Sequence, residues 1–327
     1  MTIRNKAAPA LSVILVTDHY HTISLVVACF AAQTIHEQVE MVIVLPEGRA
    51  DEVPVSELSQ VLNGVRVVEV ASIRPMPASR AAGVRATTAP VVFIGETHSF
   101  PHRRFAELIV DAHKGPWDVV VPGLLNANPS TPKSWAAFLL DYGYWHAGLS
   151  PSPIGSGPTW NASYKREVLS ELGDMLDTAL SSGDELPHEL RARNRRVYFE
   201  PRAHLDHTNV EVSGWADERF LSGLIVGANR RKRWSVPRRA FYFAASPLIP
   251  FVLLYRTARP TALLLRDGSM PRGSLAALIT GAFVRTAGEA AGYMSGISQE
   301  DEQRMEDYEL YKLRFASKLR GAVEALA

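Results

Sequence analysis

Short apolar runs alternate with helical patterns along the first 121 residues, and this alternation restricts the fold more than any other feature of the sequence. Runs of this kind, bounded by Pro and Gly, are typical of strands buried on both faces of a parallel sheet. Helical segments between successive strands predict βαβ units, whose right-handed crossovers leave few topologies. We therefore predict an α/β fold with a mostly parallel sheet and helices on both faces. The predicted strands are 11–16, 39–45, 65–70, 91–94 and 117–121, and the predicted helices are 22–32, 56–62, 77–87 and 105–113.

Polar residues follow the apolar run 91–94 immediately after Gly95. Glu96 and His98 are two positions apart, and in an extended segment that spacing directs both side chains to one face. Ligands of open α/β sheets bind just beyond the carboxyl ends of the strands. A carboxylate and an imidazole at such a place suit a divalent cation, for example Mn²⁺ or Mg²⁺. The alternative is a surface loop in which Glu96 and His98 only cap the next helix.

The second half of the chain has a less regular pattern. The segment 151–158 is too rich in Gly, Pro and Ser for regular structure, and we predict a mobile loop over a site. From residue 212 onward we find helical patterns only, the first of them at 215–233. We therefore expect two domains, an α/β domain at 1–210 and a helical extension at 211–327. Between the two regions we predict a loop at 124–132, helices at 135–146, 165–172 and 184–193, and strands at 160–164 and 196–200.

Composition excludes several classes of protein. The 35 basic residues are balanced by 34 acidic ones, so no global basic excess points to nucleic acid. The single cysteine, Cys29, excludes a disulfide framework and a cysteine metal site, and it fits a reducing cytoplasm. The first ten residues are too short and polar for a signal peptide, and no uninterrupted apolar run reaches the roughly 18 to 20 residues of a membrane span. We therefore predict a cytoplasmic location.

The last third combines basic and apolar residues. A basic cluster at 230–233 precedes an aromatic, apolar stretch at 241–255 that is broken by Pro247 and Pro250. Basic residues beside an apolar helix suit peripheral contact with anionic lipid headgroups, here at the inner face of the cell membrane. Alternatively, these helices pack on one another as a bundle or form a homodimer interface. The final helix, predicted at 300–326, is amphipathic and highly charged.

Four segments resemble, in the family's order, the motifs of family 2 glycosyltransferases with the GT-A fold. They are 11–34, 79–101, 161–174 and 188–207, and together they extend over most of the first 209 residues. The resemblance implies a Rossmann-like GT-A fold of the nucleotide-diphospho-sugar transferase type. It also implies transfer of a sugar from a nucleotide-sugar donor to a saccharide or lipid-linked acceptor, with inversion at the anomeric carbon and a divalent metal cofactor.

The chain departs from the family pattern at three places. Glu96-Thr97-His98 stands where the family usually has Asp-x-Asp, and Ala81 stands where the family's Arg-Asn-x-Gly turn has Asn. In the family, an acidic residue after the second strand often binds the nucleotide base. Here Leu45 and Pro46 follow that strand's apolar run, and Glu47 is the nearest acidic candidate. The chain is similar to a divergent bacterial branch with Glu-x-His and a helical C-terminal extension.

The resemblance implies a role for specific residues. Each has a simpler alternative: a strand-end histidine, acidic residues at a helix N-terminus, a surface arginine or a core tryptophan. The implied metal ligands are Glu96, His98 and His207; the implied donor-binding residues are Thr17, Asp18, Glu47, Arg80 and Glu96; the implied acceptor-binding residues are Trp160, Asn161 and Ser163; and the candidates for the catalytic base are Asp184, Glu185 and His188.

Two other functions compete with the transferase. The missing Asp-x-Asp favours a catalytically degenerate GT-A fold that serves as a binding or scaffold protein. A nucleotidyltransferase would need a glycine-rich phosphate loop after the first strand, but 17–21 reads TDHYH and contains no glycine. We therefore keep the degenerate fold as the alternative and set the nucleotidyltransferase aside.

Overall fold

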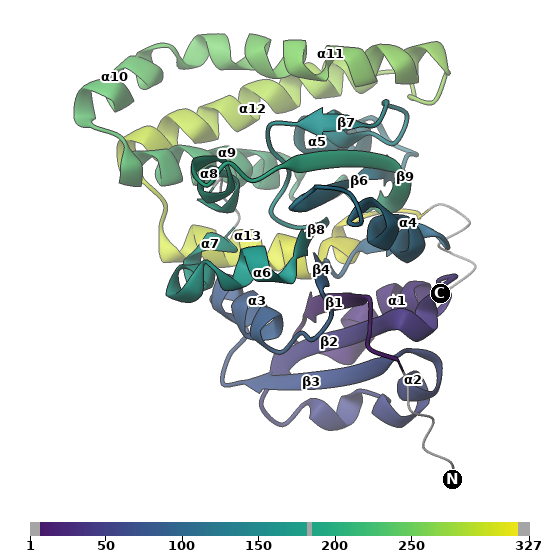
Figure 1. Cartoon of the computed structure of the whole chain (residues 1–327). Helices are drawn as coiled ribbons and strands as arrows, with labels where there is room; N and C mark the ends of the chain where they lie inside the picture. The colour runs from purple at the N-terminus through teal and green to yellow at the C-terminus, as the bar shows by residue number, and fades with distance from the viewer. Residues whose placement is uncertain (1–6, 182–184, 320–327) are drawn as a thin grey trace.

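One nine-stranded sheet forms the centre of the protein (Figure 1). The computed structural model describes residues 7–181 and 185–319. The strand order is β3-β2-β1-β4-β8-β6-β9-β5, and β7 pairs with β9 beside this path. The strands are β1 (Leu11–Val16), β2 (Val39–Pro46), β3 (Gly64–Val70), β4 (Val91–Ile94), β5 (Ser99–Pro101), β6 (Val119–Asn126), β7 (Ser152–Ile154), β8 (Ala162–Lys165) and β9 (Val197–His207).

The sheet is parallel in one half and mixed in the other. The neighbours β3, β2, β1 and β4 are all parallel, as the βαβ pattern predicts. By contrast, β8 is antiparallel to both β4 and β6, and β9 is antiparallel to β5 and β7 while parallel to β6. A mostly parallel sheet is therefore the wrong description of the second half. Apolar runs in the sequence indicate which strands are buried. The direction of a strand depends instead on the connections between strands.

Helices cover both faces of the sheet, as expected. Residues of β1 alternate between two cores: Leu11, Val13 and Leu15 face one core, while Ile14 and Val16 face the other. On the first face lie α1 (Tyr20–Ala31), α4 (Phe105–Ala112) and α5 (Pro132–Tyr142); on the second lie α3 (Met76–Arg85), α6 (Arg166–Ser170), α7 (Leu176–Ala179) and α8 (Glu185–Ala192); α2 (Val55–Val61) packs beside β3.

Three predicted elements of the middle region differ from the structure. β6 continues to Asn126, into the predicted loop 124–132, and β9 continues to His207, beyond the predicted end at residue 200. The two strands pair along this extra length after a register shift at Pro122/Gly123. β7 lies inside the predicted loop 151–158 and pairs with β9. These segments contain Pro and polar residues, so their sequences do not show a strand pattern. Their pairing with neighbouring strands in the structure identifies them as strands.

The C-terminal region is helical, as predicted, and packs on the α/β body. Its helices are α9 (Trp215–Arg233), α10 (Val236–Ala244), α11 (Ile249–Arg266), α12 (Ser274–Ser295) and α13 (Gln299–Leu310). α9 and α12 cross closely: a Cβ on Gly223 would overlap the Arg285 carbonyl, and one on Gly288 would overlap the Phe220 carbonyl. α12 also packs on α5, and Leu278 and Ala282 join the same core as Trp135. The domain boundary at residue 210 stays a prediction, since core contacts cross it.

α10 and α11 form an outer layer along α12, whereas α13 returns to the sheet (Figure 1). α13 ends at Leu310, which is buried in the second core. The predicted helix 300–326 is therefore too long, because a 3₁₀ turn at Lys312–Phe315 follows α13 and residues 320–327 lie outside the described part. By length and composition, one helical stretch in the described residues, Ser246–Arg266, is apolar enough to cross a membrane. The expectation of no such stretch considered only uninterrupted runs.

Candidate metal and donor site

Three metal-ligating side chains converge at the carboxyl ends of β4 and β9. Glu96 and His98 follow β4, and pairing of β5 with β9 sets Ser99 opposite His207. His98 Nε2 lies 3.2 Å from His207 Nε2, and these two nitrogens lie 3.5 Å and 3.4 Å from Glu96 Oε2. All three side chains are buried. We refer to Glu96, His98 and His207 as the Glu–His–His cluster.

The protonation states in the Glu–His–His cluster suit metal binding. Burial lowers the pKa of His98 well below its usual value, and the nearby Lys312 ammonium adds to this effect. Burial lowers the pKa of His207 as well. For Glu96, burial alone would raise the pKa, but the neighbouring imidazoles and Lys312 outweigh it and lower the pKa. At neutral pH the cluster therefore offers two neutral imidazoles and one carboxylate, which are the forms that coordinate metals.

The donor atoms fit a divalent cation. One ligand atom from each residue of the cluster lies within 4.8 Å of the others. Glu96 Oε2 accepts hydrogen bonds from Asn161 Nδ2 and from Ser99 Oγ, the latter at 3.1 Å. Glu96 Oε1 is buried and has no hydrogen-bond partner among the described residues. A buried carboxylate oxygen that accepts no hydrogen bond destabilises the folded state unless a ligand binds to it. A bound cation would be such a ligand.

Arg80 and Trp160 stand next to the cluster. The Arg80 guanidinium, on α3, lies 3.9 Å from the centre of the Trp160 ring and donates to the Leu180 carbonyl at 3.3 Å. Burial lowers the pKa of Arg80 to about 10, which leaves the side chain charged at neutral pH. An arginine held flat on an aromatic ring keeps donors free for a phosphate or carboxylate.

Three cavities lie at or beside the cluster. The space directly against Glu96, His98 and Arg80 measures only about 10 Å³. It shares Met76, Arg80 and Glu309 with a cavity of about 510 Å³ between α3, α8 and α13, which Trp160 and Glu185 also line. A third cavity of about 200 Å³ shares Trp160 and Glu309 and extends towards α5 and α9. Of these three, only the 510 Å³ cavity falls within the usual range for small-molecule sites, roughly 300 to 1,000 Å³.

The C-terminal segment 299–315 covers the predicted donor side. Tyr311 donates a hydrogen bond to Asp18, and Arg74 forms an ion pair with Asp307. Thr97 donates to the Leu310 carbonyl at 2.9 Å. The residues that follow β1 and β4 are therefore in contact with α13 and with the turn after it. A segment almost 300 residues away in sequence thus completes the site.

Glu309 and Lys312 are functional candidates that the sequence analysis did not identify. Lys312 Nζ contacts Glu309 Oε1 at 3.0 Å, and the two side chains are enclosed beside the cluster. Burial raises the pKa of Glu309 to about 7, whereas attraction to Glu309 and Glu96 outweighs burial and raises the pKa of Lys312. Glu309 Oε2 lies 3.9 Å from His98 Nε2. In the sequence these residues are part of a charged amphipathic pattern, and no local signal separates them from solvated charges.

The remaining predicted site residues are scattered. Thr17 is buried and donates to the His19 carbonyl, while Glu47 is exposed at the end of β2. Ser163 is bonded to His113 at 2.9 Å and donates to the Val120 carbonyl, so its hydroxyl is engaged inside the sheet. His188 lies on α8. Among the base candidates Glu185 lines the 510 Å³ cavity and accepts from Ser181 at 2.7 Å, and Asp184 lies outside the described residues.

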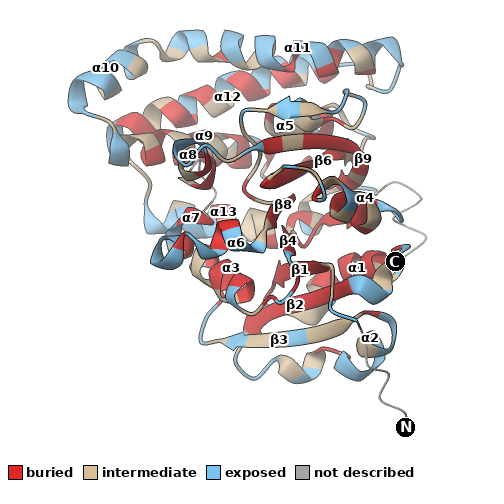
Figure 2. Cartoon of the chain, in the orientation of Figure 1, coloured by how far each residue is buried: buried red, intermediate tan, exposed pale blue. Residues whose placement is uncertain are grey.

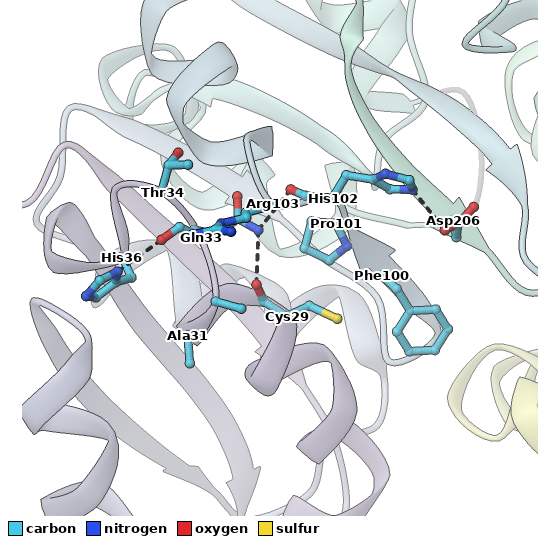
Figure 3. A pocket seen from close by; sticks show the side chains of 11 residues that line it. Cys29, Ala31, Gln33, Thr34, His36, Phe100, Pro101, His102, Arg103 and Asp206 are labelled. Carbon is cyan, nitrogen blue, oxygen red and sulfur yellow. Dashed lines mark hydrogen bonds and ion pairs between the residues drawn. The ribbon is translucent and has the colours of Figure 1, made fainter. Parts of the chain in front are cut away.

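A separate cavity of about 580 Å³ lies at the end of α1 beside β5 (Figure 3). His102 Nε2 contacts Asp206 Oδ2 at 2.9 Å there, and Gln33 ties the walls together by donating to the carbonyls of Cys29 and His102. None of the predicted site residues lines this cavity. Its size alone therefore does not make it the candidate site.

A comparison with solved structures finds a glycosyltransferase of similar fold. The structure of the mannosyltransferase PcManGT from Pyrobaculum calidifontis in complex with GDP-Man and Mn²⁺ matches 94% of this chain and 88% of that chain, with a TM-score of 0.50 and 16% sequence identity. At this identity the likeness shows the fold alone. No family model and no curated protein matches the sequence. The α/β fold is therefore consistent with a Rossmann-like glycosyltransferase fold, and membership of family 2 or of a divergent branch stays a prediction.

Proposed function

We propose that the protein is a metal-assisted glycosyltransferase that moves a sugar from a nucleotide-sugar donor to a saccharide or lipid-linked acceptor. The observation that carries the proposal is the Glu–His–His cluster, because it combines a carboxylate and two neutral imidazoles at the carboxyl ends of sheet strands. The solved structure of similar fold is in complex with GDP-Man and Mn²⁺. Mn²⁺ and Mg²⁺ are the candidate cofactors here.

The residues of this chain have distinct roles in the proposed transfer. Glu96, His98 and His207 would hold the cation, which supplies Lewis-acid stabilisation of a leaving diphosphate when bound. Arg80 pairs with the diphosphate, and Asp18 contacts the nucleoside side of the donor. Asn161 fixes the orientation of Glu96 by its hydrogen bond.

Glu185 is the base in this proposal, and Trp160 stacks on the acceptor sugar. The acceptor hydroxyl oxygen forms a bond to the anomeric carbon while the bond from that carbon to the diphosphate oxygen breaks. The hydroxyl proton moves to the Glu185 carboxylate, and the nucleoside diphosphate leaves with the electron pair. Inversion at the anomeric carbon is what the family resemblance implies for such a single displacement.

A catalytically inactive binding protein is the second candidate, and one observation favours it. Segment 299–315 lies over the cluster, and the space directly against Glu96 and His98 measures only about 10 Å³. A donor would have to displace part of that segment. A protein that only binds a partner would not need to open.

Calorimetric titration tests the proposal. GDP, UDP and dTDP are each titrated into the full chain with and without Mn²⁺, and the titrations are repeated on Glu96→Ala and His98→Ala. We expect one nucleotide to bind only with Mn²⁺, and we expect both variants to abolish that binding. His21→Ala, which removes an exposed histidine outside the cluster, is the matched control. Absence of nucleotide and Mn²⁺ binding in the wild type would favour the inactive binding protein.

A further inference from the structure

The helices α10, α11 and α12 expose an unusual number of large apolar side chains. α10 contains no buried residue among its nine positions, and Tyr255 on α11 is 82% exposed. Figure 2 shows α10 and most of α11 in the colours of exposed and intermediate residues. We define the α10–α12 surface by its exposed apolar residues, which are Val236, Phe241, Phe243, Leu248, Phe251, Val252, Tyr255, Leu265, Leu275, Ile279, Phe283 and Met294.

α11 packs some of its apolar residues on the protein and leaves others fully exposed. Its fully buried residues are Pro or Thr at four positions and Leu264, while Leu253 and Leu254 are partly buried and pack on the first core. Leu248, just before α11, and Phe251 and Tyr255 within it point outward instead, at spacings of three and four residues. A soluble helix normally places its apolar stripe on the core. Contiguous apolar patches of this kind mark interaction sites.

The exposed stripes of two helices adjoin. Leu275, Ile279 and Phe283 are four residues apart on α12, so they share one helix face. Phe283 packs edge-on against Phe251 of α11, with 6.4 Å between ring centres. The apolar side chains of α11 and α12 therefore form one surface across two helices.

The charge around the α10–α12 surface indicates the chemistry of the partner that would bind it. Residues 230–272 contain ten Lys or Arg residues and one acidic residue, Asp267, although the whole chain is nearly neutral. Arg259, Arg266 and Arg272 are exposed, and within the described residues they form no ion pair with a carboxylate. A second copy of this chain would bring the same basic surface against itself in a symmetric dimer. An apolar surface with unpaired basic residues is complementary to anionic lipid headgroups above an acyl layer.

We propose that the α10–α12 surface docks the protein on an anionic membrane, with α11 lying in the interface. Lying flat fits the structure better than crossing, because α11 packs along α12 and against the turn Gly143–Trp145, where Pro260 lies 3.5 Å from the position of a Cβ on Gly143. Crossing the bilayer would expose Thr257 and Thr261, which are buried in the protein, to the acyl chains. This docking does not depend on the proposed transferase activity, although it would bring the protein to a lipid-linked acceptor.

Vesicle co-sedimentation of the full chain tests the docking. We expect binding to phosphatidylcholine vesicles that contain phosphatidylglycerol to be about tenfold or more tighter than binding to pure phosphatidylcholine, and to weaken as salt increases. The double variants Phe251→Glu/Tyr255→Glu and Arg259→Glu/Arg266→Glu should each lower the affinity about tenfold or more. Val61→Glu and Lys114→Glu are matched controls, because they introduce the same acidic side chain at exposed apolar and basic positions of α2 and after α4.

Specific outcomes would overturn the docking. Wild-type protein that stays in the supernatant with anionic vesicles would contradict it, and so would equal binding to neutral and anionic vesicles. A dimer in sedimentation equilibrium that both double variants dissociate, without vesicle binding, would assign the surface to a second copy instead. Far-ultraviolet circular dichroism checks that the variants fold. Nucleotide titration of the same variants separates this result from the transferase proposal, since the surface does not include the Glu–His–His cluster.

Discussion

The surroundings of the Glu–His–His cluster and the α10–α12 surface depart from ordinary protein architecture in opposite directions. Around the cluster, charged groups are buried: Lys312 and Glu309 are enclosed together, and Arg219 is 1% exposed between Glu218 and Asp141. On the α10–α12 surface, Phe251 and Tyr255 are exposed instead. Burying an unpaired charge lowers the stability of the folded state. An exposed aromatic ring does not contribute the hydrophobic stabilisation that its burial would give.

The difference indicates that the side chains of each region suit a binding partner better than they suit water. The buried charges suit a cation and a charged donor, and the exposed rings suit an apolar layer below charged headgroups. The two regions are joined by the close crossing of α9 and α12.

Gly288→Ala tests whether the close packing of α9 on α12, which joins the two regions, stabilises the fold. The added Cβ would overlap the Phe220 carbonyl of α9, so the helices must separate. We expect the free energy of unfolding to fall by about 3 kcal/mol. Gly155→Ala is the matched control, since no atom lies within 4 Å of the position of its Cβ. Chemical denaturation of both variants measures the effect, and equal stabilities would contradict a close crossing.

Glu96→Gln tests whether the cluster is built for a cation. It keeps the shape of the side chain but removes the charge that a cation requires. We expect Mn²⁺ affinity to fall at least about 10- to 100-fold, the range for loss of groups that only orient a metal ligand. Electron paramagnetic resonance of free Mn²⁺ measures this directly, without knowledge of the substrate. Retention of full Mn²⁺ affinity in Glu96→Gln would show that the cluster only contributes to folding.

The buried His113, which lies outside the Glu–His–His cluster, should make the free energy of unfolding depend on pH. Burial lowers its pKa to about 4, whereas an unfolded chain takes up this proton near a pH of about 6.5. Between these values the unfolded state binds more protons, so stability decreases as the pH falls from about 6.5 to about 4. His113→Asn should remove about 3 kcal/mol of this decrease, even though the variant is less stable at pH 7. Urea unfolding at pH 7, 5.5 and 4 measures the difference, and unchanged pH dependence would contradict the prediction.

The cover over the donor side should resist nucleotide binding. Asp307→Asn and Tyr311→Phe together weaken the contacts of segment 299–315 with Arg74 and Asp18. If a donor needs the segment to withdraw, the double variant should bind the nucleotide about three- to tenfold more tightly. Glu300→Gln, a charge removal in the first turn of α13, is the control. Weaker binding in the double variant would indicate that the segment itself contacts the nucleotide.

Tyr255→Ser should have the smallest effect on folding. The side chain is 82% exposed, so its removal should change the free energy of unfolding by less than about 0.5 kcal/mol. Phe93→Ala is the contrasting variant: this ring is 2% exposed and packs on Phe105 with 5.0 Å between ring centres, and its loss should cost about 3 to 5 kcal/mol. Similar losses in thermal unfolding would mean that Tyr255 is covered in solution.

The sequence predicted local elements well where periodicity was strong. The strand at 11–16 and the helix at 215–233 are confirmed at both ends. Of the cluster, Glu96 and His98 were identified from their spacing, and His207 only through the family resemblance. Ser163 was proposed for the acceptor, but its hydroxyl is bonded within the sheet, because the face to which a strand residue points depends on register.

Composition and periodicity determined the α/β class, the positions of most strands and helices, and the helical C-terminal region, because burial patterns repeat over a few residues. Only the tertiary structure decided the direction of β8, the approach of His207 to Glu96, and the burial of Glu309 and Lys312 beside them. It also decided that Phe251 and Tyr255 of α11 are exposed. These features depend on contacts between residues far apart in the chain, and local sequence carries no record of which distant segment will occupy a given face.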